Sequence, residues 1–144
     1  IDCRYCHTSV ETTAKANIPP TATCMNCHKN VRAASEKLIP IQESFATGLP
    51  VEWVRVHDLP DYVYFNHSAH VTRGVGCGSC HGRIDRMEVV YQWATLSMGW
   101  CLDCHRAPDE YVVPTREISG LDVDPALLSR AIPQGPTHCS ACHH

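Results

Sequence analysis

The stretch Cys77-Gly78-Ser79-Cys80-His81 shows the pattern on which the fold of this chain depends. The same spacing of two cysteines and a following histidine also occurs at residues 3–7, 24–28, 101–105 and 139–143. The five copies contain all 10 cysteines of the 144-residue chain and half of its 10 histidines. C-x-x-C-H is the attachment pattern for c-type haem, in which two thioether bonds hold the ring and the histidine ligates the iron. The sequence therefore predicts five covalently bound c-type haems.

Paired cysteines can also bind zinc, form a redox-active dithiol or form structural disulfides. None of these uses requires a histidine after every second cysteine. Because histidine makes up about 7% of the chain, chance would place one after all five pairs with a probability on the order of 10⁻⁶. The pattern therefore favours haem. The predicted attachment residues are Cys3, Cys6, Cys24, Cys27, Cys77, Cys80, Cys101, Cys104, Cys139 and Cys142, and the predicted proximal ligands are His7, His28, His81, His105 and His143.

The histidines outside the motifs provide one further candidate ligand for each iron. They are His57, His67, His70, His138 and His144. If residues 65–70 are helical, the three-residue spacing of His67 and His70 puts both imidazoles on one face, where they can serve two adjacent haems. His67 is close in sequence to the motif at 77–81 and is expected to serve its haem, whereas His70 serves another.

The remaining three candidates are expected to act over longer distances. His138 and His144 directly flank the fifth motif, so each is expected to ligate a neighbouring iron rather than its own. His57 is far from every motif and is assigned as a distal ligand by elimination. One or two of the five can instead be ordinary surface or core histidines. Methionine competes for the same role, because His/Met ligation occurs in cytochromes c; the three methionines are Met25, Met87 and Met98.

The charge balance and hydropathy exclude several classes of protein. The net charge is -3, from 12 Lys and Arg against 15 Asp and Glu. Without a run of basic residues, the chain lacks the usual footprint of a nucleic-acid-binding protein. No stretch approaches the roughly 18 apolar residues of a membrane-spanning helix. The chain starts at Ile1 without a methionine, so we expect a processed or truncated start, with room for an anchor upstream.

The composition also predicts the fold class. The chain has only 2 Phe, and dividing 144 residues among five haems leaves about 29 residues for each, too few for separate apolar cores. We therefore expect a mainly irregular chain with short α-helices, a multihaem cytochrome c fold in which the haems form the core. The motif spacing divides it into an N-terminal two-haem unit with its connection, residues 1–50, and a three-haem unit, residues 51–144, packed as one domain.

Individual elements are weakly indicated. A short helix is expected over residues 31–39, after the second motif. Another is expected over residues 125–131, with Asp124 as its N-cap and Pro125 at its first position. Weak alternation over residues 51–56 predicts a short strand. Elsewhere, proline and glycine predict loops.

Part of the chain resembles the class III multihaem cytochromes. The stretch Asp61-Tyr62-Val63-Tyr64-Phe65-Asn66-His67-Ser68-Ala69-His70, followed by the motif at 77–81, carries the F-x-H-x-x-H pattern of that class. There the first histidine ligates the local haem and the second ligates another, which implies these roles for His67 and His70. The doubled His143-His144 also resembles that class, and implies that His144 ligates a neighbouring haem.

A more extensive resemblance covers nearly the whole chain. Its segments are residues 18–20 before the second motif, residues 51–60 (VEWVRVHDLP) and residues 97–106 (SMGWCLDCHR). Together they are similar to the pentahaem cytochrome c subunit of bacterial alternative complex III, a membrane-bound quinol oxidoreductase. The resemblance implies a subunit on the periplasmic side of the inner membrane. Its implied partners are an iron–sulfur subunit, a monohaem cytochrome c subunit and integral membrane subunits.

The predicted function is electron relay from quinol to a downstream cytochrome or oxidase, without catalytic residues in this chain. Attachment of c-type haem takes place outside the cytoplasm, which also predicts a periplasmic location. Two alternatives stay open at this stage. One is a soluble periplasmic electron shuttle, and the other is a multihaem reductase with one open haem iron.

Overall fold

The computed structural model describes residues 1–121, 124–128 and 132–144. Within these ranges the chain is mainly irregular with short helices and no strands, as the composition predicts. The α-helices are α1 (Cys3–Cys6), α2 (Thr21–His28), α3 (Ile39–Thr47), α4 (His67–Val71), α5 (Cys77–His81) and α6 (Met98–Arg106). The 3₁₀ turns are η1 (Glu36–Leu38), η2 (Ile84–Arg86), η3 (Pro108–Glu110), η4 (Thr115–Glu117), η5 (Pro125–Leu127) and η6 (Cys139–Ala141).

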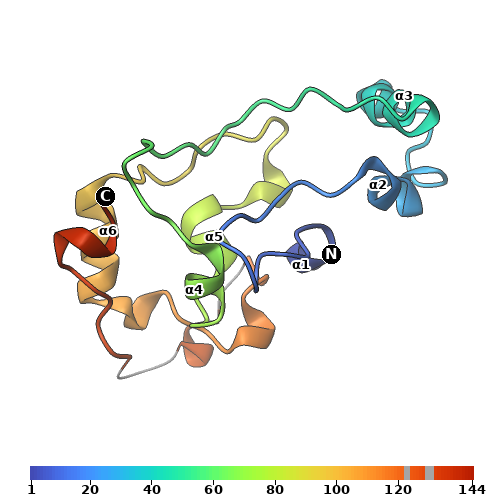
Figure 1. Cartoon of the computed structure of the whole chain (residues 1–144). Coiled ribbons are helices and arrows are strands. Elements are labelled where there is room, and N and C mark those ends of the chain that lie inside the picture. Colours follow the sequence, from blue (N-terminus) through green and yellow to red (C-terminus); the bar gives the residue numbers. More distant parts are fainter. Residues whose placement is uncertain (122–123, 129–131) are drawn as a thin grey trace.

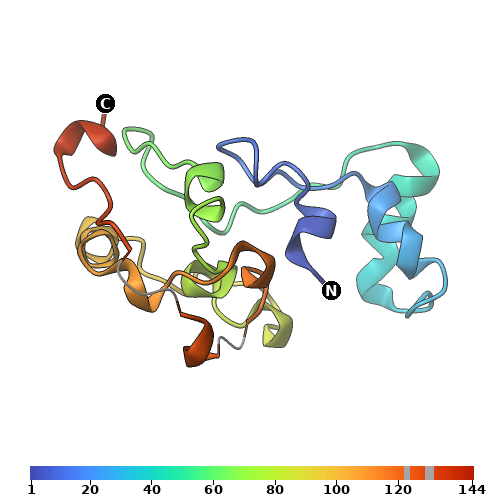
Figure 2. The same cartoon turned by 90° about the horizontal axis from the view of Figure 1, so that it is seen from below.

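The helices are spread along an elongated molecule rather than gathered into a bundle. Both views place α2 and α3 together at one end, followed by α1, then α4 and α5, with α6 and the C-terminus at the opposite end (Figures 1 and 2). Two isolated antiparallel bridges tie distant segments together, Val63 with His143 and Val75 with Val112. Helix α1 precedes α2 in the sequence but lies between α2 and α5 in space.

The chain's own apolar core is small. One cluster joins Val10, Val71, Val113 and Ile118, and only Ile118 is completely buried. The total accessible surface is 10164 Å², whereas a compact monomer of this mass exposes about 7,400 Å². Many large apolar side chains, including Trp53 at 53% exposure, face outward. Side chains alone therefore do not build the interior, which fits a core made of flat prosthetic groups.

The helix expected at residues 31–39 lies further along the chain. Residues 31–35 form turns, with Arg32 in the left-handed region at φ 53°, and the α-helix begins only at Ile39 after η1. Pro40 sits in the first turn of α3, where its missing N–H costs nothing. Gly48, at φ 74°, ends the helix in a left-handed conformation that glycine adopts freely. Pro40 therefore lies at the start of the observed helix. The prediction of a helix over residues 31–39 is wrong.

The strand expected at residues 51–56 is also wrong, because this segment is extended but belongs to no strand or bridge. A strand needs a partner for its backbone groups, and Val54 here is 85% exposed. The helix expected from Pro125 is present as the short turn η5. Its N-cap is confirmed, since the Asp124 carboxylate accepts a hydrogen bond from the Ala126 N–H at 2.9 Å. Residues 129–131 of that prediction lie outside the described residues.

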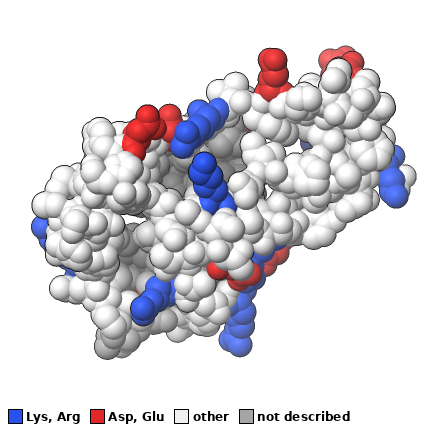
Figure 3. Space-filling model, in the orientation of Figure 1, with Lys and Arg blue, Asp and Glu red and all other residues white. Residues whose placement is uncertain are grey.

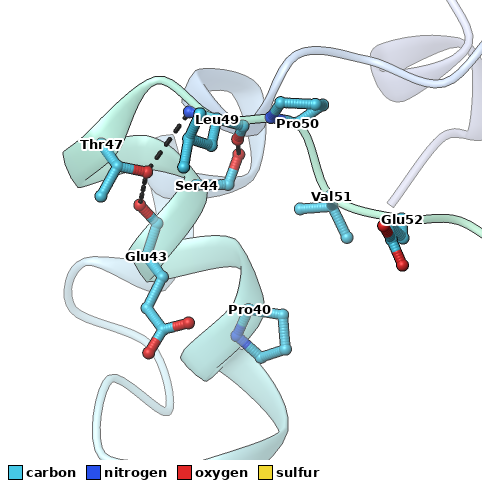
Figure 4. Close-up of a pocket in the computed structure, with 8 residues that line it drawn as sticks. All are labelled: Pro40, Glu43, Ser44, Thr47, Leu49, Pro50, Val51 and Glu52. Carbon is cyan, nitrogen blue, oxygen red and sulfur yellow. Dashed lines mark hydrogen bonds between the residues drawn. The ribbon is translucent and has the colours of Figure 1, made fainter.

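A groove of about 540 Å³ lies beside α3, where the chain turns back after the helix. Hydrogen bonds from two side-chain hydroxyls hold its wall in place (Figure 4). The Ser44 hydroxyl donates to the Leu49 carbonyl at 2.6 Å, and the Thr47 hydroxyl donates to the Glu43 carbonyl at 2.7 Å. No cysteine or histidine lines the groove. Within the described ranges, no helix has the length and apolar character needed to cross a membrane.

Candidate functional site

Each of the five motifs begins on a short helix or turn. Helices α1, α2, α5 and α6 each contain both cysteines of one motif, and η6 begins at the first cysteine of the last. A spacing of three residues puts both cysteines on one face of a helical turn, and the histidine follows at its end. Side chains fix where two of these helices start: Asp2 accepts from the Arg4 N–H at 2.8 Å, and Ser97 accepts from the Trp100 N–H at 3.3 Å.

The donor groups fit haem better than zinc or disulfides. All ten cysteines are free thiols. In the described part of the chain, no three histidine, cysteine, aspartate or glutamate side chains gather as a metal-binding cluster. A structural zinc site requires about four protein ligands around one ion. A haem iron takes four nitrogens from its porphyrin, so it needs only two protein ligands, one from each face. Each of the five sets of two thiols and one imidazole would supply the attachment points of one haem and one of the two ligands of its iron.

Backbone carbonyls orient three of the five motif imidazoles. The Nδ1–H of His7 donates to the Asn17 carbonyl at 2.6 Å, and that of His28 donates to the Val31 carbonyl at 3.0 Å. The Nδ1–H of His105 donates to Pro136 at 2.6 Å. A donor bond at Nδ1 fixes the tautomer and leaves Nε2 with a free lone pair, as in metal-bound histidines. These three side chains are therefore preset to ligate through Nε2.

Helix α4 carries the two histidines of the F-x-H-x-x-H pattern, so the condition set for residues 65–70 holds over His67–Val71. The Asn66 side chain caps it by accepting from the Ala69 N–H at 3.4 Å. The Nδ1–H groups of His67 and His70 donate to the carbonyls of Ala14 at 2.9 Å and Asn66 at 2.8 Å. Both imidazoles are therefore held in the same tautomer as the motif histidines and offer Nε2.

His67 faces the motif histidine His81. Their ring centres are 6.5 Å apart and their planes are inclined by only 8°. Metal–imidazole bonds are about 2.0–2.1 Å long, so two imidazoles on opposite sides of one metal have ring centres about 6 Å apart. The observed separation fits two ligands of a single iron. His67 is therefore next to the motif at 77–81, the one whose haem the sequence analysis expects it to serve.

His70 faces a different motif histidine, His105 of α6. The ring centres are 6.1 Å apart, with an angle of 33° between the planes. With metal–nitrogen bonds of about 2 Å, this separation also fits two imidazoles that share one metal. Helix α4 thus presents two imidazoles, three residues apart, toward two separate motifs.

The structure does not bring the other candidate ligands into such pairs. His57 lies beside His81, with its Nε2 3.3 Å from Nδ1 of His81. His144 donates from Nε2 to the Asp61 carbonyl at 2.7 Å. His143 stacks on Tyr62 with ring centres 5.9 Å apart. His138 is the N-cap of η6. In the described ranges, no ring pair comparable to that of His67 and His81 joins another histidine to His7, His28 or His143.

Burial keeps two of the facing imidazoles neutral. It lowers the pKa of His81 to about 4, with the neighbouring His57, His67 and His7 adding to the effect. Burial also lowers the pKa of His70, against the opposing effect of its hydrogen bond to Asn66. Only a neutral imidazole has a lone pair to give a metal. Both side chains are therefore ready to ligate at neutral pH.

The methionines show no arrangement that favours them as ligands. Met98 is the first residue of α6 and is 61% exposed, while Met25 and Met87 are partly buried. Met25 lies inside the second motif on α2, and Met87 is the C-cap residue that follows η2. The facing histidine pairs are the stronger geometric candidates for axial ligation.

Sequence reasoning missed the residues that hold the motif histidines in place. The clearest is Gly135, whose N–H donates to the His105 carbonyl at 2.8 Å. A Cβ at this position would lie 2.7 Å from Cγ of His105, so only glycine allows this approach. The following Pro136 supplies the carbonyl for His105 Nδ1. The pair Gly135-Pro136, just before the last motif, is the sequence feature that could have indicated this support of His105.

Charged side chains are dispersed over the face seen in Figure 3, and most of that surface carries no charge. Several ion pairs are local, such as Arg4 with Asp2 at 2.8 Å and Arg55 with Asp58 at 3.0 Å. A longer-range pair joins Lys37 to Glu88 at 2.8 Å, and both side chains are well exposed. Exposed pairs of this kind contribute about 0–1 kcal/mol each, so they do not hold the fold together.

Comparison with known proteins gives two matches. Residues 63–144 match the family described as cytochrome c7 and related cytochrome c. The multihaem cytochrome c subunit of the menaquinone reductase of Nitratidesulfovibrio vulgaris is 34% identical over 82 residues. That alignment covers 56% of this chain and 38% of the relative, so the chain matches well under half of the relative's length. The family match includes the third, fourth and fifth motifs and helix α4.

Proposed function

The chain belongs to the family of cytochrome c7 and related cytochromes c, and from this we propose that it is a five-haem electron-relay subunit of a membrane-bound quinol oxidoreductase of the alternative complex III type. That it is a multihaem c-type cytochrome of electron transport follows from the family. The number of haems, the ligand set, the complex and the direction of electron flow are the proposal.

The observation that carries the proposal is the facing of His67 to His81 and of His70 to His105, at ring separations of 6.5 and 6.1 Å. Two irons ligated by histidine on both sides have no position left for a substrate. A chain built of such sites carries electrons and does not transform a bound molecule. This supports a relay over a reductase with an open iron.

The residues of the chain have distinct tasks in this relay. The ten motif cysteines would attach five haems, and His7, His28, His81, His105 and His143 would ligate their irons. His57, His67, His70, His138 and His144 supply the opposite ligands. Backbone carbonyls at Asn17, Val31 and Pro136 hold the motif imidazoles in the ligating tautomer. When bound, the haems supply reversible one-electron chemistry at iron.

The proposed location is the periplasmic side of the inner membrane, next to an iron–sulfur subunit, a monohaem cytochrome c subunit and integral membrane subunits. Two similarities support membrane partners: the resemblance of residues 51–60 and 97–106 to the alternative complex III subunit, and the relative that is a subunit of a menaquinone reductase. Within the assembly, quinol oxidation belongs to the partners and this chain conducts the electrons.

Isolation from the native membrane tests the proposal. We expect the holoprotein, extracted in detergent, to co-purify at high salt with iron–sulfur and integral membrane subunits. We also expect added menaquinol to reduce its haems in that complex. A soluble, partner-free protein whose haems are not reduced by quinol in the presence of membranes would contradict the proposal and favour the shuttle.

A further inference from the structure

The five motifs follow a different order in space from their order in the sequence. We propose that they form a single row in the order second, first, third, fourth, fifth, so that electrons enter and leave at the second and fifth motifs. This inference rests on the proposed five-haem relay. It concerns which haem is next to which, and therefore which two haems are the ends of the relay.

The second motif is in contact with the first. Within the two motifs, the Asn26 side-chain amide donates to the Tyr5 hydroxyl at 3.1 Å. Helix α2 lies at the end of the molecule beyond α1 in both views (Figures 1 and 2).

The first motif is also in contact with the third, although many residues separate them in the chain. The same backbone segment holds both motifs. The Ser119 hydroxyl donates to Asp2 at 2.7 Å, and the Cys77 N–H donates to the Ile118 carbonyl at 2.8 Å. The first motif is therefore an interior member of the row.

The third and fourth motifs share helix α4. His67 faces His81 of the third motif and His70 faces His105 of the fourth. Two imidazoles on one turn of helix bring two irons into adjacent positions.

The fifth motif follows the fourth. The Gly135-Pro136 segment that leads into the fifth motif accepts from and donates to His105, at 2.6 and 2.8 Å. The C-terminus lies at the opposite end of the molecule from α2 (Figure 1).

Because a thioether fixes the edge of each haem at its motif, neighbouring motifs imply neighbouring haems. An electron entering at the second motif then passes the first, third and fourth before it reaches the fifth. Each step moves one electron from a reduced iron to an oxidised one, and no bond forms or breaks. A one-electron donor at one end and a one-electron acceptor at the other complete the balance.

Two matched double variants distinguish this order from the sequence order. Cys3→Ala with Cys6→Ala removes the first haem, and Cys24→Ala with Cys27→Ala removes the second. Electron paramagnetic resonance of the oxidised holoproteins then shows whether one haem has lost its magnetic neighbours. We expect one isolated haem of four after removal of the first, because this cuts the second from the row. Removal of the second should leave four coupled haems. Four coupled haems after removal of the first, with one isolated haem after removal of the second, would overturn the order.

A measurement on the wild-type holoprotein does not depend on the folding of these variants. Fully reduced low-spin haems are diamagnetic, so proton NMR can detect contacts between substituents of adjacent haems. We expect contacts between the haems of the first and third motifs. Contacts between those of the second and third, with none from the first to the third, would overturn the order. Fewer than five covalent haems in the wild type would instead contradict the proposed function itself.

Discussion

At the scale of single residues, the tautomer of each imidazole decides which nitrogen can meet an iron. Five histidines donate from Nδ1 to a backbone carbonyl, and each of these bonds is between 2.6 and 3.0 Å. Such partners orient metal-bound histidines and increase their basicity as ligands. The sequence marks which histidines to consider, but the acceptors are main-chain atoms that any residue could supply. Only the folded chain reveals them.

His70→Ala tests the assignment of a single distal ligand. We expect all five haems to stay attached, because the cysteines are untouched, while one iron of the five loses its second imidazole. Electron paramagnetic resonance should then show a new high-spin signal corresponding to one haem. Ala69→Ser, next to it on α4 and exposed, is the matched control and should show none. A purely low-spin spectrum of His70→Ala would remove His70 from the ligand set.

Gly135→Ala tests the support behind His105. Its new Cβ would lie 2.7 Å from Cγ of His105, and we expect overpacking to cost about 1–3 kcal/mol in the free energy of unfolding. The signal of the fourth haem should shift as its proximal imidazole is displaced. Gly99→Ala is the control, since no atom lies within 4 Å of its Cβ position. Equal unfolding curves and spectra for the two variants would argue against the positioning role of Gly135.

At the scale of elements, the sequence predicts helices well where a side chain or a motif fixes them. The expected cap is present, since Asp124 caps the turn at Pro125. A helix around His67 and His70 was only a condition of the two-haem reading, and α4 meets it. The helix expected over 31–39 was wrong because Arg32 takes a left-handed backbone conformation, which the sequence does not mark. The strand expected over 51–56 was wrong because no neighbouring strand exists to pair with it in the described chain.

Helix α1 provides a prediction about pH. Its cap, Asp2, accepts from the Arg4 guanidinium and the Ser119 hydroxyl, and the Arg4 bond holds the pKa of this carboxyl well below its usual value. A folded-state pKa lower than the unfolded one means that the carboxylate stabilises the fold above about pH 4 and loses this effect as the pH falls further. Because Asp2 is partly exposed, we expect a contribution of only about 1 kcal/mol.

Asp2→Asn isolates this contribution, since the amide keeps an oxygen to cap the helix. Denaturant unfolding between pH 7 and pH 2 should show a smaller loss of stability for Asp2→Asn than for the wild type on the acid side of about pH 4. At neutral pH the variant should be the less stable of the two. Parallel pH profiles would mean that Asp2 has the same pKa in the folded and unfolded chains.

At the scale of the whole molecule, the motif count could be predicted from sequence but the arrangement of the motifs could not. Spacing along the chain suggested a first pair and a later group. The first motif and the third, however, are both bonded by the segment Ile118-Ser119, which no local pattern indicates. Neighbour relations between motifs depend on how loops such as the one carrying Ile118 and Ser119 fold back. Those contacts are long-range and carry no signature in a single sequence.

The large exposed surface predicts that haem attachment and folding are coupled. The chain exposes 10164 Å² and buries few apolar side chains among themselves. We expect the chain produced without the haem-attachment machinery to be expanded, with a larger hydrodynamic radius than the holoprotein and little protection from protease. Size-exclusion chromatography with light scattering measures this directly. An unattached chain as compact as the holoprotein would mean that its side chains suffice as a core.

The most direct test of the central claim is the intact mass of the purified holoprotein under denaturing conditions, where only covalently attached groups remain. We expect the mass of the chain plus five haems, with no thiol left for alkylation, because ten cysteines form ten thioethers. A mass with fewer haems and alkylatable cysteines, or one showing disulfides, would contradict it.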